Sequence, residues 1–377
     1  MAAEDAVVTL QAVGDVKVNR DHPESAFTHV APTFHQSDIL FGNCETPSSD
    51  KGSPNPISSS YRREPPRNLV ALKFAGFHVM SFANNHCLDW GYDAFFDTLE
   101  RLRKINILPV GAGNDIDEAR KPVIIERKGT RVAFLAYASV IFLGYAADEQ
   151  KPGCAPIRVY THYHQVEHEQ PGTDPEIFTF PDPDDLEAMR QDVQKARSSA
   201  DVVVVSEHWG LHFVPFKLAR YESEVAKVAI DAGADLILGH HQHILKAIEV
   251  YKGKAIFHSL GNFVIDAASA LKAEKKPGIR RMMKRYADRV GIWPDCPLYP
   301  LHPDSRKTVI AKCLIRNKRI EKVSFIPCLI NAQNSPEVLT RDNKDFDEGV
   351  QYLEEITKKA DIDTKFIVEG DEVVVSL

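Results

Sequence analysis

Residues 235–243 read Asp-Leu-Ile-Leu-Gly-His-His-Gln-His, a short apolar run followed by a glycine and three histidines. The run Asp235–Leu238 has the length and apolar character of a buried strand. His240, His241 and His243 follow it directly, and three imidazoles at a strand end have little packing rationale. Ligands of α/β proteins collect at the carboxyl ends of strands, so this stretch predicts a strand that delivers histidines to a site.

Polar residues follow four other predicted strands in the same way. The strands are Val7–Val13, Asp38–Gly42, His78–Phe82 and Asp201–Ser206, and the turns are Gly14-Asp15, Asn43-Cys44-Glu45, Ala83-Asn84-Asn85-His86 and Glu207-His208-Trp209-Gly210. Each turn has an ordinary explanation by itself: Asp15 as a helix cap, Glu45 as a solvated acid, Asn84 and Asn85 as turn residues, and His208 as a core histidine. Five such turns in order favour a shared site.

The segments between these strands have helical periodicity. Pro66–Ala75, Tyr92–Ile105, Asp185–Ser199, Arg220–Ala232 and Asp345–Lys359 carry apolar residues at helical spacing. Alternating strands and helices predict an α/β fold. Two hairpins are expected around Lys128-Gly129 and Lys252-Gly253, and a third is expected to join Thr308–Arg316 to Arg319–Ile326. The sheets are therefore predicted to be mixed. The last residues should form one short strand.

Two segments interrupt the pattern. Residues 144–185 contain many prolines, histidines and acids, and we interpret this excursion as a lid inserted in the core. Residues 270–286 form a basic segment of helical character. Because no repeat or linker separates the chain, we predict a single domain over residues 1–377, with its motif core at 7–266 and residues 300–377 completing the fold.

Composition limits the partners and the compartment. The net charge is −7 without a basic block, which argues against nucleic-acid binding. Neither a signal peptide nor an apolar run of eighteen residues is present in this sequence, so we expect no membrane span and a cytoplasmic location. The six cysteines lack metal-binding or disulfide spacing and are predicted to be reduced and buried. The oligomeric state is left open.

Carboxylate, amide and imidazole groups on converging turns suit a divalent metal such as Mn, Zn or Fe. The motifs Gly14-Asp15, Asn43-x-Glu45, Asn85-His86, His208-Trp209-Gly210, Gly239-His240-His241-x-His243 and Ser259-Leu260-Gly261-Asn262 occur in this order. Together they resemble the CapA/PgsA-like family, which is associated with poly-γ-glutamate capsule synthesis and belongs to the calcineurin-like metallophosphoesterase superfamily. The resemblance implies a four-layer α/β/β/α sandwich, with two mixed sheets flanked by helices and a metal site at the strand ends.

The resemblance also implies roles for single residues. Asp15, Glu45 and His243 would bind a first metal, Asn85, His208 and His241 would bind a second, and His86 would assist the leaving group. Two positions depart from the superfamily pattern: Lys17 stands where an imidazole is expected, and Glu45 replaces an aspartate. The site could therefore hold two metals, one, or none with Lys17 supplying the positive charge.

The remaining candidates contact substrate in our interpretation. Lys17, Asn84 and Arg306 are the candidate substrate-binding residues, and Arg306 could clamp a carboxylate or phosphate with two hydrogen bonds. His302 is a further catalytic candidate beside Asp15 and His86. The alternative interpretation of Tyr299–Arg306 is a polar loop without a role in the site, with an internal contact between Asp304 and Arg306.

These features support three hypotheses for the function. The first is a hydrolase that uses metal-activated water on an amide-like or ester-like bond, preferably γ-glutamyl or peptide, of a small anionic or peptide-like substrate. The second keeps the pocket but exchanges a proton beside a carbonyl, which makes an epimerase or lyase without metal. The third is a non-catalytic component of a poly-γ-glutamate synthesis complex.

Overall fold

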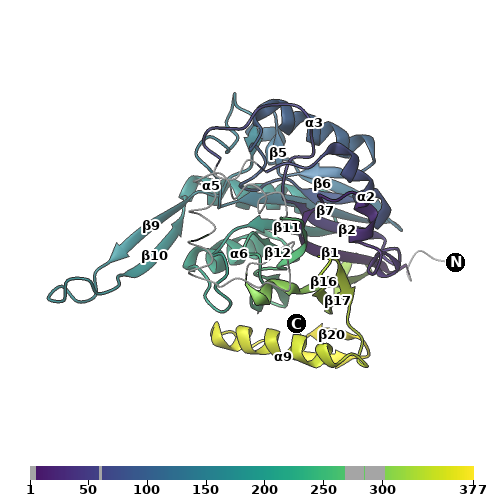
Figure 1. Cartoon of the computed structure of the whole chain (residues 1–377). Helices are drawn as coiled ribbons and strands as arrows, with labels where there is room; N and C mark the ends of the chain where they lie inside the picture. The colour runs from purple at the N-terminus through teal and green to yellow at the C-terminus, as the bar shows by residue number, and fades with distance from the viewer. Residues whose placement is uncertain (1–5, 59–61, 268–283, 285–301) are drawn as a thin grey trace.

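The computed structural model describes residues 6–58, 62–267, 284 and 302–377, and two large sheets dominate it (Figure 1). The larger sheet has the strand order β19-β20-β17-β16-β1-β2-β3-β4, with β15 beside β1 and β18 beside β17. Its strands are β1 (Val8–Lys17), β2 (Ile39–Cys44), β3 (Val79–Ser81), β4 (Leu108–Val110), β15 (Asn262–Ile265), β16 (Lys307–Arg316), β17 (Arg319–Ile330), β18 (Pro336–Val338), β19 (Phe366–Glu369) and β20 (Glu372–Val375).

The second sheet has six strands in the order β13-β14-β12-β11-β7-β6. They are β6 (Val123–Arg127), β7 (Thr130–Ala138), β11 (Val202–His208), β12 (Leu236–His240), β13 (Ile248–Tyr251) and β14 (Lys254–Phe257). Strands β7, β11, β12 and β14 are parallel to one another, as are β1 to β4 and β15 in the larger sheet. Parallel strands end at the same edge, so each sheet gathers its strand-end turns there.

The two sheets share a core. Along β11, Val202 and Val204 belong to the cluster that also contains Phe41 of β2 and Phe134 of β7, whose rings stack with centroids 5.4 Å apart. The alternate residues Val203 and Val205 pack in a second cluster with α5 and α6. This alternation is the pattern of a strand buried on both faces.

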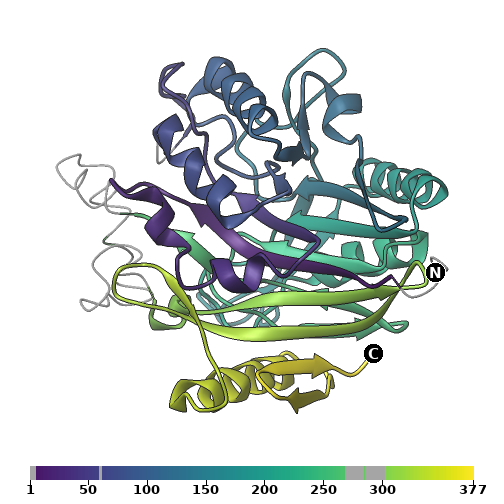
Figure 2. The ribbon, with the colours of Figure 1, turned by 90° about the vertical axis from the view of Figure 1, so that its right-hand side faces the viewer.

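Helices cover the outer sides of the sheets (Figure 2). The main ones are α2 (Leu69–Ala75) and α3 (Gly91–Lys104) beside the larger sheet, α5 (Pro183–Ser199) and α6 (Arg220–Ala232) on the second, and α9 (Lys344–Lys359) against β17 and β13. Shorter helical elements are α1 (Ala31–Phe34), α4 (Ile116–Ala119), η2 (Pro23–Ala26), η3 (Pro66–Asn68) and η5 (Pro303–Arg306). The predicted fold class, a four-layer α/β/β/α sandwich with two mixed sheets, is confirmed.

The predicted hairpins are present with the expected turns. Lys128 and Gly129 have φ values of 49° and 76°, and Lys252 and Gly253 have 50° and 71°. Positive φ at both central residues matches the twist of the strands on either side, which is why these turns join β6 to β7 and β13 to β14. One expectation is corrected at the C-terminus, where the single predicted strand is the hairpin β19–β20.

The excursion at 144–185 contains regular structure that its composition did not indicate. Strand β8 (Gly153–Cys154) pairs with β5 (Ala112–Gly113), and β9 (Val159–His164) pairs with β10 (Glu176–Pro181) in a hairpin that projects from the body (Figure 1). Its assignment as a lid stays a prediction, as does the single-domain division. The basic segment 270–286 lies outside the described residues apart from Lys284.

No helix in the described part of the chain combines the length and apolar character needed to cross a bilayer. The cytoplasmic location stays a prediction. The five described cysteines, Cys44, Cys87, Cys154, Cys313 and Cys328, are buried free thiols, as expected for reduced core residues. Cys296 lies outside the described residues.

Candidate metal centre

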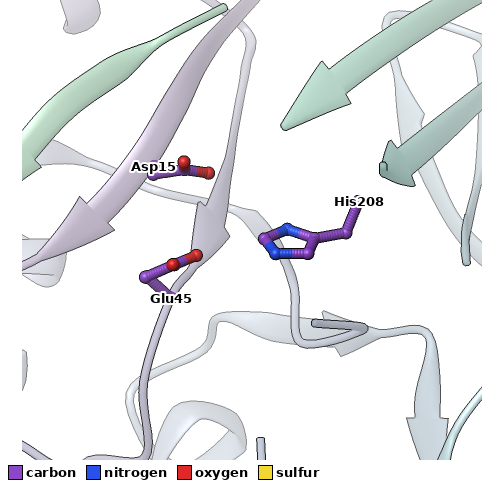
Figure 3. Close-up of side chains that lie close together, drawn as sticks. All are labelled: Asp15, Glu45 and His208. Atoms are coloured by element: carbon purple, nitrogen blue, oxygen red, sulfur yellow. The ribbon is translucent and has the colours of Figure 1, made fainter. Parts of the chain in front are cut away.

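Three side chains from the strand ends of both sheets lie close together (Figure 3). Asp15 comes from β1, Glu45 follows β2 and His208 ends β11, and all three are buried. One ligand atom from each lies within 4.8 Å of the other two. Gly14 lets the backbone before Asp15 pass close to Gly261, because any Cβ at position 14 would overlap the Gly261 carbonyl oxygen, which accepts from the Asp15 N–H at 3.0 Å.

The two carboxylates are held together by one amide. Asn43 Nδ2 donates to Asp15 Oδ1 and to Glu45 Oε2, each at 2.8 Å. Asn84 supports the arrangement from the next loop, donating through Nδ2 to Asn43 Oδ1 at 3.2 Å and to the Cys44 carbonyl at 2.8 Å. Asn84 was a substrate-binding candidate, yet its buried amide joins two loops and its Oδ1 accepts from the His86 backbone N–H at 3.0 Å.

The turn after β12 brings in two more histidines. His243 Nδ1 lies 3.2 Å from Asp15 Oδ2, and its Nε2 lies 3.7 Å from Glu45 Oε1. His241 and His243 have φ values of 90° and 58°, a region that non-glycine residues rarely occupy. Such backbone strain persists where the surrounding structure fixes it and is concentrated at functional sites.

The sixth ligand candidate completes the other side of the cluster. Asn85 Oδ1 lies 2.9 Å from His208 Nε2, and the His208 and His241 rings are 4.8 Å apart between centroids. All six predicted ligands therefore gather in one buried cluster. Asp15, Glu45 and His243 contact one another on one side, and Asn85, His208 and His241 lie together on the other.

The polar atoms of this cluster fit a cation. Glu45 Oε1, His208 Nδ1 and His241 Nδ1 are buried without a hydrogen-bond partner among the described residues. Buried polar atoms normally have partners, so three unsatisfied acceptors or ring nitrogens in one place indicate a ligand site. Carboxylate oxygen, amide oxygen and imidazole nitrogen together are the donor set of Mn, Fe or Zn.

The carboxylates and imidazoles titrate unequally without a cation. Burial and the negative charge of Asp15 raise the pKa of Glu45 well above its usual value. Burial would also raise the pKa of Asp15, but hydrogen bonds and charge interactions with His240 and His243 hold it well below the usual value. Burial, with smaller repulsion from neighbouring imidazoles, holds the pKa values of His208 and His241 well below normal, so both rings are neutral, as metal ligands must be.

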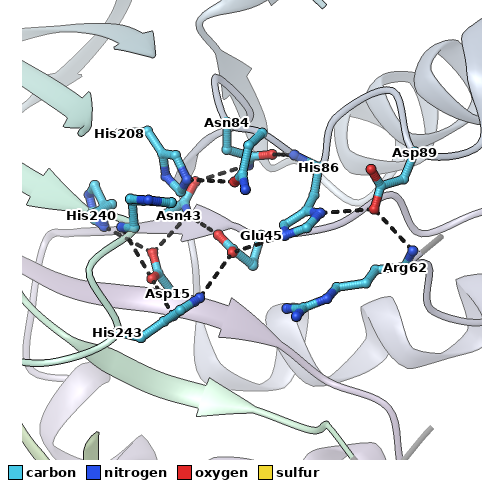
Figure 4. A network of polar contacts seen from close by, with 12 residues as sticks. Asp15, Asn43, Glu45, Arg62, Asn84, His86, Asp89, His208, His240 and His243 are labelled. Atoms are coloured by element: carbon cyan, nitrogen blue, oxygen red, sulfur yellow. Dashed lines mark hydrogen bonds and ion pairs between the residues drawn. The ribbon is translucent and has the colours of Figure 1, made fainter. Parts of the chain in front are cut away.

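His86 lies at the edge of the cluster with a partner behind it (Figure 4). Its Nδ1 lies 2.8 Å from Asp89 Oδ2, and its Nε2 lies 3.8 Å from Glu45 Oε1. Burial lowers the pKa of His86, although Asp89 opposes that effect. A carboxylate behind an imidazole fixes its orientation and leaves the other nitrogen facing the site.

Lys17 is buried beside the cluster, as the sequence suggested. Burial, followed by the charge of Arg62, lowers its pKa to about 8. Arg62 was not predicted: it follows the Asn43–Glu45 turn in an irregular segment where no motif distinguishes it. Its backbone N–H donates to Asp89 Oδ2 at 3.0 Å, and its side chain extends toward Glu45 and His243 in Figure 4.

His212 is the second residue that the sequence analysis missed. Its ring stacks on His241 with 3.9 Å between centroids and lies 5.2 Å from the His243 ring. A histidine one turn beyond the His208-Trp209-Gly210 motif was the available signal. Its pKa is held well below normal, first by burial and then by the charge of His243.

The two candidates from the C-terminal part lie farther away. His302 stacks on Phe213, with 6.0 Å between ring centroids, and Phe213 in turn lies 6.0 Å from the His243 ring. Arg306 lines a separate cavity of about 310 Å³ and donates through Nε to the Ile330 carbonyl at 2.8 Å. The predicted contact between Asp304 and Arg306 is replaced by one with Lys307, whose Nζ donates a hydrogen bond to Asp304 Oδ1 at 3.1 Å.

Comparisons with known proteins agree with these motifs. A family model described as "Bacterial capsule synthesis protein PGA_cap" matches residues 9–267. The chain is 33% identical over 272 residues to "PGA biosynthesis protein CapA" of Bacillus subtilis, covering 70% of this chain and 64% of that protein. It is 31% identical over 234 residues to a "Probable polyglutamine synthesis accessory protein" of Mycobacterium tuberculosis, covering 61% and 56%.

The chain thus spans less than two thirds of the length of these relatives. Among solved structures, a calcineurin-like phosphoesterase of Bacillus subtilis has 11% identity and a TM-score of 0.38, over 95% of this chain and 99% of that one.

Proposed function

Because this chain belongs to the bacterial capsule synthesis protein family PGA_cap, we propose that it is a metal-dependent hydrolase acting on a γ-glutamyl or peptide-type amide bond of an anionic substrate. The observation that carries the proposal is the buried group of Asp15, Glu45 and His208, whose ligand atoms lie within 4.8 Å of one another. Buried carboxylates and imidazoles at such distances are costly to fold unless a cation is their partner.

The proposed roles follow from the contacts. Asp15, Glu45 and His243 would hold one cation, and Asn85, His208 and His241 would hold a second one or complete the first. A divalent ion bound there supplies Lewis acidity and activates water for attack on a carbonyl. Asn43 orients both carboxylates through its two 2.8 Å hydrogen bonds.

His86 is the proposed acid for the leaving group. Asp89 accepts from its Nδ1–H, so the Nε2 that faces Glu45 is the atom that would first take a proton from the attacking water and then pass it to the departing amine. An amine is a poor leaving group unless it is protonated as the bond breaks, which is why an amide hydrolase needs such a residue. The names of the relatives, which refer to PGA and polyglutamine synthesis, favour a γ-glutamyl amide over a phosphoester.

Elemental analysis of protein purified without an affinity metal tests the proposal, together with hydrolysis of short γ-glutamate oligomers. The expected result is one or two equivalents of a transition metal and amine release that stops in a chelator. A His208→Ala/His241→Ala double variant should lose the metal and the activity together. Folded protein that cleaves the oligomers without any metal would refute the metal-dependent reading. Deuterium uptake from heavy water without cleavage would instead identify a metal-independent epimerase or lyase.

A second candidate function is a non-catalytic part of a polymer-synthesis complex. The word "accessory" in the name of the mycobacterial relative favours it. This candidate predicts metal-loaded protein that cleaves no oligomer but raises polymer output when added to the membrane ligase. The two candidates therefore differ in one observable, amine release by the isolated protein.

A further inference from the structure

Arg62 has an unusual environment for a partly buried guanidinium. Its Nε is buried and has no hydrogen-bond partner within the described residues. Its own backbone and that of Glu64 are held by hydrogen bonds, since the Arg62 N–H donates to Asp89 Oδ2 at 3.0 Å and the Glu64 N–H donates to the Pro47 carbonyl at 2.9 Å. An arginine held in place by its backbone, with an unpaired buried N–H on its side chain, is typical of a group that awaits a ligand.

The guanidinium lies next to the candidate metal centre. It is close enough for its charge to act on Lys17, Glu45 and His86, three groups at the centre. Figure 4 shows the side chain extending from Asp89 past His86 toward Glu45 and His243. Arg62 thus lies on the same side of the cluster as the nitrogen that we propose protonates the leaving group.

No nearby acid of the described residues forms an ion pair with this cation. Asp266 is committed to Arg20, with which it forms hydrogen bonds of 2.6 Å and 2.8 Å. Glu64 and Asp266 interact with Lys17, and burial raises the pKa of Glu64 to about 7. No carboxylate oxygen lies within 4.0 Å of the Arg62 guanidinium in the portion of the chain that the structure describes. Two adjacent cations, Arg62 and Lys17, therefore repel each other in the ligand-free site.

We infer that Arg62, assisted by Lys17, binds a carboxylate of the substrate that lies beside the bond to be cleaved. A guanidinium pairs with a planar carboxylate through two parallel N–H···O bonds, a geometry that an ammonium does not offer. In a γ-linked glutamate chain, the carbon attached to each amide nitrogen carries a free carboxylate. A carboxylate on Arg62 would place that nitrogen near His86. This inference rests on the proposed function and names its specificity determinant.

The test compares two dipeptides that differ by one carboxylate. γ-Glutamyl-glutamate carries the carboxylate next to the amide nitrogen, and γ-glutamyl-4-aminobutyrate lacks it. Binding is measured by calorimetry on metal-loaded protein with catalysis blocked by His86→Ala, so that no product forms. We expect the first dipeptide to bind at least about 10-fold more tightly, since a bidentate charged pair contributes that much or more.

Arg62→Gln should remove this preference by weakening γ-glutamyl-glutamate alone, and Arg62→Lys should restore only part of it. The matched control is Arg63→Gln, which changes the charge equally but removes a guanidinium that lies 3.5 Å from the centre of the Trp90 ring. The inference is wrong if neither dipeptide binds, if Arg62→Gln weakens both dipeptides equally, or if it weakens only the binding of inorganic phosphate.

The outcomes separate this inference from the proposed function. Metal content and oligomer cleavage report on the hydrolase, whereas the dipeptide preference reports on Arg62. A wild-type protein that discriminates through Arg62 but never cleaves would uphold the inference and refute the hydrolase. If the wild-type protein cleaves both dipeptides and Arg62→Gln cleaves each of them as fast as the wild type does, the hydrolase would be upheld and the inference about Arg62 refuted. Elemental analysis of the Arg62→Gln variant should give the wild-type metal content.

Discussion

The imidazole of His212 lies against that of His241, with 3.9 Å between ring centroids and 29° between planes. It also lies within 5.2 Å of His243, so one ring supports two candidate metal ligands. We predict that His212→Ala weakens metal binding by about 10-fold to 100-fold, because the loss of a ligand's support loosens its orientation. His212→Phe keeps the ring contact and should retain most of the affinity. Competition with a chromogenic chelator measures both, and equal losses would show that a ring nitrogen matters instead.

The two carboxylates should respond differently to neutralisation. Burial and the charge of Asp15 raise the pKa of Glu45 well above its usual value and favour its protonated form, whereas His240 and His243 hold the pKa of Asp15 well below its usual value and favour the ionised form. Glu45→Gln should therefore change the free energy of unfolding by less than about 1 kcal/mol, and Asp15→Asn should cost about 2–3 kcal/mol. Urea denaturation at pH 7 with a chelator present measures both values. Both variants should lose the metal, and equal destabilisation would contradict the predicted charge states.

Lys246 should make stability depend on pH. Its Nζ donates to the carbonyls of Val214 and Lys217 in the loop that carries His212, and burial lowers its pKa from 10.5 to about 8. Between pH 8 and 10.5 the unfolded chain binds more protons than the folded one, so this group makes stability rise with pH.

Relative to Lys246→Met, the wild-type protein should gain about 1–2 kcal/mol between pH 8 and pH 9.5. Well below pH 8, at about pH 6.5 and lower, the difference between the two proteins should be constant, since the lysine is then charged in both states. Urea denaturation at several pH values measures the difference, and a flat difference up to pH 9.5 would contradict the lowered pKa.

The five described cysteines should be inert in the folded protein. All are buried, and burial raises the pKa of Cys313 to about 12, so thiolate is scarce. In a Cys296→Ser variant, a chromogenic disulfide reagent should label no thiol in native buffer and five in denaturant. Fast labelling of the native variant would show that one of the five opens to solvent.

The sequence alone was sufficient for the fold class, and it named six side chains that the structure places near one another; their role as metal ligands stays a prediction. Strand residues such as Leu236–Leu238 are apolar without interruption, and the polar turns begin where each run ends. That pattern lies within short stretches of the chain, so it can be recognised from the sequence without the three-dimensional structure. The family motifs added roles for Asp15, Glu45 and the histidines, and the structure brings them together.

Only the tertiary structure decided which other residues join this centre. Arg62 and His212 lie on irregular segments, where no periodicity predicts the direction of a side chain, and both turn toward the cluster. Arg306 instead lines a separate cavity, and Asn84 is committed to neighbouring loops. Contacts between segments far apart in sequence depend on how the two sheets pack, and no local pattern records that packing.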